Sequence, residues 1–203
     1  MTNKCNYFRR NFSSDFISNT INLSEIPILS TKRLILRKLS LENQNDIFEY
    51  ASIPEVSTCL QWKPHKSIED TLEFLKLVDQ EFKDLKFIVF GIELKKERKL
   101  IGTIALRNWD KPDRSIDVGY AISKKYWNKG LTTEAVKAVI KFGFEKLNAN
   151  RIEAHCDEHS TASYRVMEKA GMKYEGTLRQ KILIKNKFTS MRFYSILREE
   201  FYR

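Results

Sequence analysis

Residues 116–144 constrain the fold of this chain more than any other stretch of its sequence. Their first part alternates between large apolar side chains and small or polar ones, which is typical of a strand with two unlike faces. Asp117, Gly119 and Ala121 form the second face, and their small size leaves room for a ligand to lie against the strand. The large apolar face comprises Ile116, Val118, Tyr120 and Ile122.

A polar turn, N-K-G-L-T-T, follows this strand and leads into a helix whose apolar residues recur at helical spacing. The first N–H groups of a helix have no partner within the helix, so they and the helix dipole attract anions. Gly130 lets the backbone approach such a ligand closely. The sequence therefore predicts a strand, a phosphate-binding turn at residues 128–133 and a helix in direct succession. The apolar helix positions are Val136, Val139, Ile140, Gly143 and Leu147.

The composition favours one globular domain in the cytoplasm. The chain has 203 residues, enough for a sizeable core, and 42% of them are hydrophobic. Cys5, Cys59 and Cys156 are odd in number and widely spaced, which predicts neither a disulfide framework nor a structural zinc site and favours a reducing compartment. No apolar run approaches the roughly 20 residues of a membrane span, so we expect no membrane partner.

The net charge of +10 raises the question of a nucleic-acid partner. Lysine and arginine are interleaved with 26 acidic residues, and the sequence shows no basic helix face, zinc-finger spacing or RNA-binding aromatic signature. We therefore expect no DNA partner and an ordinary solvated surface. An acidic ligand or association with a ribosome is the alternative use of this charge.

The order of the expected elements predicts an α/β or α+β sheet flanked by helices. Residues 1–29 show neither helical nor strand periodicity and are expected to be an appendage to a domain at residues 30–203. Pro54 and Pro64 bracket a loop. Strands are expected at 33–39, 87–94, 99–109, 116–122, 151–157, 172–179 and 191–197, and helices at 42–51, 68–82, 131–147 and 161–170.

The chain carries, in order, T-K-R-L-I-L-R, V-G-Y-A-I with Y-W-N-K-G-L-T-T-E-A, N-A-N-R-I-E-A, S-Y-R-V-M-E-K-A-G-M-K-Y-E-G-T-L-R and Y-S-I-L-R-E-E-F. In this order the segments resemble the Gcn5-related N-acetyltransferase (GNAT) family, and more narrowly its RimJ/RimL-type branch. The resemblance implies the GNAT fold, a mixed sheet of about seven strands with a splayed central pair and about four helices. It also implies direct transfer of acetyl from acetyl-coenzyme A (acetyl-CoA) to a primary amine, without a metal or a covalent enzyme intermediate. A monomer and a homodimer are both open.

The resemblance also implies which residues bind the coenzyme. Its pantetheine arm is expected beside Ala121 and Ile122, and its diphosphate on the turn before the long helix. Trp127 stands where the general family pattern has Gln or Arg, and Thr132 where it has a smaller residue. Ser160 stands where the family commonly has Asn. A serine lacks the two donors of an amide, which predicts weaker coenzyme binding. The expected coenzyme residues are Ala121, Ile122, Trp127, Asn128, Lys129, Gly130, Leu131, Thr132, Thr133, Ser160 and Ser163.

The thiolate that leaves in this reaction needs a proton. The family commonly supplies it from a tyrosine at the position of Met167, which has no proton to give. In the RimJ/RimL branch a serine at the position of Ser163 is proposed for this role, so the resemblance implies Ser163 as the acid. Tyr164 and Tyr194 are alternatives, and helix capping or a coenzyme contact is the other interpretation of Ser163.

Asp117 is the best carboxylate for a general base, acting directly or through water, with a structural hydrogen bond as the alternative. Ile182 stands where some members of the branch carry an acidic residue, so the sequence shows no strong base. This bears on the acceptor, because an α-amine with a pKa of about 7.7 is neutral at pH 7 far more often than a lysine of about 10.4. The difference is worth about 3.7 kcal/mol.

We therefore favour a protein N-terminal α-amine, such as that of a ribosomal protein, as the acceptor. A small-molecule amine of low pKa, including an antibiotic, is the alternative. Met167, Ser160 and Ile182 also leave open a protein that binds acetyl-CoA without turnover.

His155, Cys156 and His159 invite a metal or nucleophile interpretation, but we expect structural roles for them. Strand alternation points His155 and Cys156 to opposite faces, and no further metal ligand is near in sequence. Three loop residues are expected either to flank the acceptor pocket or to pack against their neighbours: Trp62, His65 and Trp109.

Overall fold

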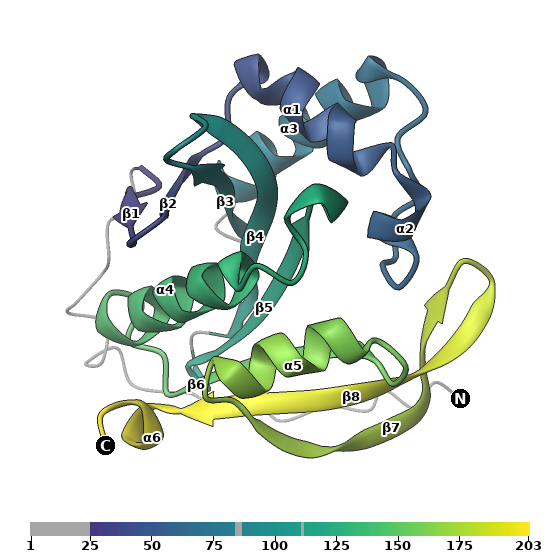
Figure 1. Ribbon diagram of the computed structural model, residues 1–203. Helices are drawn as coiled ribbons and strands as arrows, with labels where there is room; N and C mark the ends of the chain where they lie inside the picture. The colour runs from purple at the N-terminus through teal and green to yellow at the C-terminus, as the bar shows by residue number, and fades with distance from the viewer. Residues whose placement is uncertain (1–24, 84–86, 111) are drawn as a thin grey trace, which may run out of the picture.

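The computed structural model describes residues 25–83, 87–110 and 112–203. They form one eight-stranded mixed sheet with helices on both faces, as Figure 1 shows. The strand order is β1-β2-β3-β4-β5-β6-β8-β7. The predicted mixed sheet is confirmed, with one strand more than expected because Leu29–Ser30 pair with β2.

The strands are β1 (Leu29–Ser30), β2 (Leu34–Lys38), β3 (Phe87–Leu94), β4 (Lys99–Asp110), β5 (Ser115–Ile122), β6 (Arg151–Asp157), β7 (Lys173–Ile184) and β8 (Lys187–Leu197). The helices are α1 (Gln44–Ala51), α2 (Pro54–Ser57), α3 (Ile68–Lys83), α4 (Leu131–Glu145), α5 (Thr161–Lys169) and α6 (Arg198–Phe201). Short 3₁₀ turns precede α1 at Leu41–Asn43 and follow β5 at Lys124–Tyr126.

The middle of the sheet is open between β5 and β6. These two strands run parallel and pair only through Ser115–Asp117 against Arg151–Glu153. Beyond this point β5 continues to Ile122 and β6 to Asp157 without pairing to each other. The expected splayed central pair is therefore confirmed, and it leaves a gap in the sheet that side chains or a ligand can fill.

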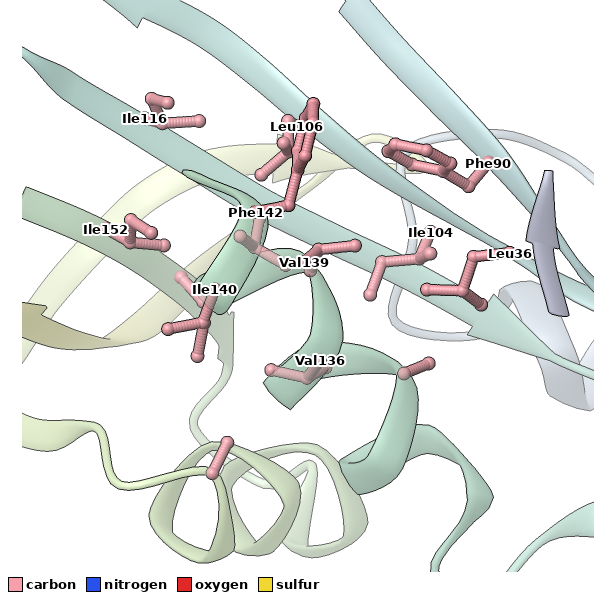
Figure 2. Packing of buried hydrophobic residues seen from close by; sticks show 14 of the residues in the cluster. Leu36, Phe90, Ile104, Leu106, Ile116, Val136, Val139, Ile140, Phe142 and Ile152 are labelled. Carbon is pink, nitrogen blue, oxygen red and sulfur yellow. The ribbon is translucent and has the colours of Figure 1, made fainter. Parts of the chain in front are cut away.

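The larger hydrophobic core lies between the sheet and α4. Figure 2 shows Val136, Val139 and Ile140 of α4 facing the strands that carry Ile104 and Ile116. All five side chains are at most 1% exposed. Burial of an apolar side chain of this size stabilises the fold by about 1.5–3 kcal/mol. The apolar stripe of α4 thus fixes this helix, and with it the turn that enters it, against the middle of the sheet.

A smaller core lies on the opposite face, under α1 and α3. Strand alternation sends Ile88 and Phe90 of β3 into the larger core and Val89, between them, into the smaller one. There Val89 meets Ile47 of α1 and Leu75 of α3 in one buried cluster. In Figure 1 the three N-terminal helices lie together at one end of the sheet, across the gap from α4 and α5.

The sequence predicted a loop between Pro54 and Pro64. The structure shows that this segment is not wholly a loop. It begins with α2, a single helical turn that starts at Pro54. Proline is tolerated at the first helical position because its missing N–H would have no partner there, so Pro54 starts a turn of helix instead of preventing one.

The last two strands form a longer hairpin than the sequence predicts. β7 extends to Ile184 and β8 begins at Lys187, with Lys185 and Asn186 between them at φ values of 48° and 66°. Both values are left-handed, as a two-residue type I′ hairpin turn requires. Phe188 beside this turn is exposed, so the alternation of buried and exposed residues that marks a strand is missing at the tip.

Residues 1–24 of the predicted appendage lie outside the described residues. Ile26, also within the predicted appendage, is 7% exposed and belongs to the larger core. The boundary at residue 29 stays a prediction. In the described part of the chain, every helix is too short or too polar to cross a bilayer.

Candidate active site

A cavity of about 350 Å³ opens where β5 and β6 diverge. The small residues of β5 and the end of β6 contribute to it, together with the α2–α3 loop, α3, α5 and the β7–β8 hairpin. Apolar side chains make up most of its lining. The bulkiest of them include Leu60, Trp62, Phe74, Val78, Ile184 and Met191.

The three loop aromatics have different surroundings. Trp62 lines the cavity, as one of its two interpretations predicted. His65 lies beside it, with ring centroids 5.7 Å apart, and its Nδ1 is 2.8 Å from the hydroxyl of Thr71. Trp109 packs against the larger core instead.

The turn that enters α4 has the backbone shape expected of an anion site. Gly130 precedes the helix with a left-handed φ of 71°, a conformation that favours glycine. Arg33 braces the turn from outside, since its Nη1 donates to the carbonyl of Lys129 at 2.9 Å and its Nε to Glu134 at 2.7 Å. The N–H groups of the first helical turn, beginning at Leu131, have no partner within α4 and point out of the helix end.

Trp127 connects this turn to the end of β5. Its indole Nε1 donates to the carbonyl of Ile122 at 2.9 Å, and 38% of the residue is exposed. The sequence predicted Trp127 only as a coenzyme residue, and the structure adds that it joins the two parts of the expected coenzyme site. Of the β5 residues expected beside the pantetheine arm, Ala121 lines the cavity and Ile122 is buried.

These features fit a long anionic ligand such as acetyl-CoA. A helix end with free N–H groups can hold a diphosphate, and the gap between β5 and β6 can take a narrow arm that reaches the cavity. When bound, the coenzyme supplies an acetyl group activated as a thioester.

Ser163 and Tyr120 form a hydroxyl pair at the cavity. The two oxygen atoms are 3.0 Å apart, and the Tyr120 hydroxyl is also 3.0 Å from the Ser163 carbonyl oxygen. Burial raises the pKa of Tyr120, so this phenol stays protonated at neutral pH. Ser160, at the start of α5, and Met167, one turn after Ser163, line the same cavity.

Tyr194 lies away from this pair. It is 1% exposed, its hydroxyl donates to Glu168 at 3.4 Å, and burial raises its pKa. Tyr194 is not among the residues that line the cavity. Tyr164, the other tyrosine considered for the acid, has the guanidinium of Arg192 4.7 Å above its ring.

Asp117 is buried and paired. Its Oδ2 accepts from Arg107 Nη2 at 2.6 Å, and its Oδ1 is 3.6 Å from His155 Nδ1. Burial raises the pKa of Asp117, while the positive charge of Arg107 opposes that shift. Arg107 and His155 line the cavity and Asp117 does not, so its carboxylate reaches the cavity only through these neighbours.

The sequence did not single out Arg107 or Tyr120, although Gly119 gave a signal. The small face at Gly119 was interpreted as room for a ligand alone. A Cβ at this position would lie 2.8 Å from the guanidinium carbon of Arg107, so the glycine also accommodates that side chain. A glycine inside a strand marks such close approaches in general.

His155 and Cys156 both line the cavity, although they alternate along β6. This is because the gap between β5 and β6 exposes both sides of the strand to one space. Burial raises the pKa of the Cys156 thiol to about 11, so it is protonated at neutral pH and is a poor nucleophile. His159 is exposed, with Glu158 3.7 Å away. Among the described residues, no group of three or more His, Cys, Asp or Glu is arranged to hold a metal.

Comparisons with known proteins show the family of this chain. A sequence model for the acetyltransferase (GNAT) domain matches residues 33–173. The uncharacterized N-acetyltransferase YnaD of Bacillus subtilis (strain 168) is 31% identical over 172 residues, which cover 85% of this chain and 98% of YnaD. A crystal structure of a GNAT-family acetyltransferase from Bacillus anthracis has a TM-score of 0.77 at 30% identity, covering 85% of this chain and 99% of that one.

A spermidine N-acetyltransferase from Vibrio cholerae, solved with CoA and spermine, has a TM-score of 0.74 at 21% identity, covering 85% of this chain and 100% of that one. At this identity the likeness concerns the fold alone. The fold and the family match together define an acyltransferase that uses acetyl-CoA. The chain belongs to the GNAT family and is an N-acetyltransferase.

Proposed function

We propose that this N-acetyltransferase modifies a primary amine of low pKa, in particular the α-amine of a protein N-terminus with an apolar first residue. The observation that carries the proposal is the character of the cavity. Its lining is mostly apolar, and only Glu81 and Asp157 contribute carboxylates to it. Its volume of about 350 Å³ is near the lower end for ligand pockets, which suits the first residue of a peptide.

The same observation argues against a polyamine acceptor. A polyamine carries several positive charges, and each buried charge needs a partner to offset its loss of hydration. Two carboxylates among apolar walls offer few such partners. The relative that acetylates spermidine shares the fold, and a shared fold does not decide the acceptor.

For the coenzyme, we propose that the turn at residues 128–133 and the first turn of α4 hold the diphosphate, with Trp127 at the edge. The support is the left-handed Gly130 and the helix end that follows it. The thioester end then lies toward Ala121, which lines the same cavity as Ser160 and Ser163.

Ser163 is proposed to give the departing sulfur its proton and to regain one from solvent, with the hydroxyl of Tyr120 holding it in place. Ser163 lines the cavity and its hydroxyl is bonded to that of Tyr120. Tyr194 is less suited to this role, because its hydroxyl is bonded to Glu168 and it does not line the cavity.

The acceptor is identified by thiol release from acetyl-CoA with four acceptors at equal concentration. These are a peptide with a free N-terminal leucine, the same peptide with a blocked N-terminus and an internal lysine, spermidine, and an aminoglycoside. We expect release mainly with the first peptide. Preference for a small amine would replace the N-terminal proposal, and coenzyme binding without release for every acceptor would contradict the transferase.

The net positive charge of the chain favours association with an acidic surface such as a ribosome. We propose that the enzyme meets its acceptor there. Co-sedimentation with ribosomes at rising salt tests this separately. We expect association that weakens as salt increases, and no association at low salt would contradict it.

A further inference from the structure

Asp117 and His155 lie together at the point where the sheet opens. Asp117 is the last residue of β5 that pairs with β6, and its partner in register is Glu153. His155 follows Glu153 by two residues, so the two share a face of β6. The side chains of Asp117 and His155 therefore meet at the head of the gap that forms the cavity.

One oxygen of Asp117 is directed at His155. Oδ2 is held by Arg107 at 2.6 Å, whereas Oδ1 is buried and without a hydrogen-bond partner in the described structure. The ring Nδ1 of His155 is 3.6 Å from Oδ1. This separation exceeds a hydrogen bond by a few tenths of an ångström, and such contacts often tighten when substrate is bound.

The ring of His155 is held in one plane. It stacks on Phe193 of β8, with centroids 5.3 Å apart and planes 26° from parallel. When Nδ1 donates its hydrogen to Asp117, the other nitrogen, Nε2, is left as a free acceptor. His155 lines the cavity, so an acceptor amine bound there can meet its ring.

The surroundings keep this ring neutral at neutral pH. Burial lowers the pKa of His155, and Arg107 of β4 lowers it further, while Asp117 of β5 and Glu153 of β6 raise it. β8 contributes the uncharged Phe193. The other charged groups that line the same cavity are Glu81 of α3 and Asp157 of β6.

We propose that His155 is the general base of this site, and that Asp117, fixed by Arg107, is the residue that positions it. This inference rests on the acetyltransferase function proposed above. Nε2 of His155 takes one proton from the ammonium group of the acceptor. The N–H bond breaks with its electron pair left on the amine nitrogen, an Nε2–H bond forms, and the new imidazolium is balanced by Asp117.

Such a base also limits the acceptor. The pKa of an α-ammonium is about one unit above that of an ordinary histidine, and that of a lysine is about four units above it. Burial lowers the pKa of His155 and widens both differences, but an N-terminal ammonium stays about three pKa units easier for it to deprotonate than a lysine. A histidine base therefore favours the same acceptor, an N-terminal α-amine, as the one proposed above.

The first test compares His155→Gln with the wild type in acceptor-dependent thiol release between pH 5.5 and pH 9. About a sixth of an α-amine with a pKa of about 7.7 is already neutral at pH 7, so loss of the base that removes the ammonium proton should lower kcat/KM at pH 7 by about sixfold. The loss should shrink toward pH 9, because the acceptor, with a pKa of about 7.7, is then neutral without help. His159→Gln, which removes an exposed histidine four residues away, should leave the profile unchanged.

A second readout needs no turnover. The chain has three histidines, so His155 can be assigned in NMR spectra by comparison with His155→Gln, and its pKa can be measured in the free protein. Asp117→Asn should lower the pKa of His155, because a negative neighbour favours the charged ring.

Three results would overturn the inference. An active wild type with an equal loss in His155→Gln at every pH, or with no loss, would remove the base role and leave the proposed function standing. An unchanged pKa of His155 in Asp117→Asn would remove the positioning role. A wild type that binds acetyl-CoA but acetylates no amine would overturn the function and the base together.

Discussion

The two ends of the active site are built in different ways. The expected coenzyme end is one continuous segment, in which β5, the turn at residues 128–133 and α4 follow each other along the chain. The cavity, the proposed acceptor end, draws its lining from elements that span Cys59 to Met191. Local backbone rules therefore shape the first end, whereas long-range packing shapes the second.

The ends also differ in how they are held. α4 is fixed by a stripe of fully buried side chains in the larger core. The β7–β8 hairpin has exposed apolar residues near its tip and is joined to α2 by Lys185, whose Nζ donates to the carbonyl of Ser57 at 2.8 Å. We expect substitutions at the two ends to separate coenzyme binding from acceptor binding.

The largest effect is expected at Gly130. Alanine in the left-handed region costs about 1–2 kcal/mol, so Gly130→Ala should strain the turn and misalign its N–H groups. We expect coenzyme A to bind about tenfold more weakly by calorimetry, with the acceptor KM unchanged. Gly171→Ala is the control, because Gly171 has a φ of 92° beyond the end of α5. If both variants bind coenzyme A like the wild type, the coenzyme does not use this turn.

The next effect is expected at Trp62. Trp62→Ala removes an apolar wall of the cavity, and loss of about 1.4 kcal/mol of contact corresponds to a tenfold change. We expect the acceptor KM to rise about tenfold and the affinity for coenzyme A to stay the same. Trp127→Phe, which removes the bond to Ile122, should do the opposite. Equal effects of both changes on both ligands would show that the ends are not separable.

A smaller effect is expected where Lys185 links the hairpin to α2. Lys185→Met keeps the aliphatic stem but loses the bonds to the carbonyl and hydroxyl of Ser57, and charge-assisted bonds are worth about 1.5–3 kcal/mol. We expect the free energy of unfolding in urea to fall by about 1.5 kcal/mol and the acceptor KM to rise about threefold. Lys187→Met removes an exposed neighbour and should change neither. A coenzyme effect larger than the acceptor effect would contradict the division.

The smallest effect concerns Glu175, which joins β7 to Arg151 of β6. Hydrogen bonds from Arg151 lower the pKa of Glu175 to about 2. A carboxylate whose pKa is lower in the folded state than in the unfolded state stabilises the protein at any pH above the unfolded-state pKa, here near 4.5. This contribution is lost as the pH falls toward 2.

Glu175→Gln should therefore unfold more easily than the wild type at pH 7, by less than about 1 kcal/mol because the pair is partly exposed. The two proteins should converge as the pH approaches 2. Urea unfolding at pH 7, 4.5 and 2.5 measures this. A difference in the free energy of unfolding that is as large at pH 2.5 as at pH 7 would mean that the substitution acts through packing and not through the charge.

Much of the fold followed from local patterns. The alternation at residues 116–122, the helical spacing after Gly130 and the order of the motifs predicted β5, α4 and the GNAT fold with its splayed strands. The hairpin tip at Lys185 was missed, because Leu183 and Phe188 on either side of it are exposed apolar residues and alternation carries no signal there. The turn of helix at Pro54 was missed because proline marks both loops and helix starts.

At the site, the sequence alone determined the turn and helix end at which we expect the coenzyme, since a glycine before an amphipathic helix fixes its own backbone shape and its own free N–H groups. It also indicated Asp117, but not what Asp117 contacts. Only the tertiary structure brought Arg107 of the preceding strand and His155 of β6, beyond α4 in the sequence, to that carboxylate. The physical reason is that backbone conformation depends on near neighbours, whereas a side chain's charge partners depend on which strands the fold lays side by side.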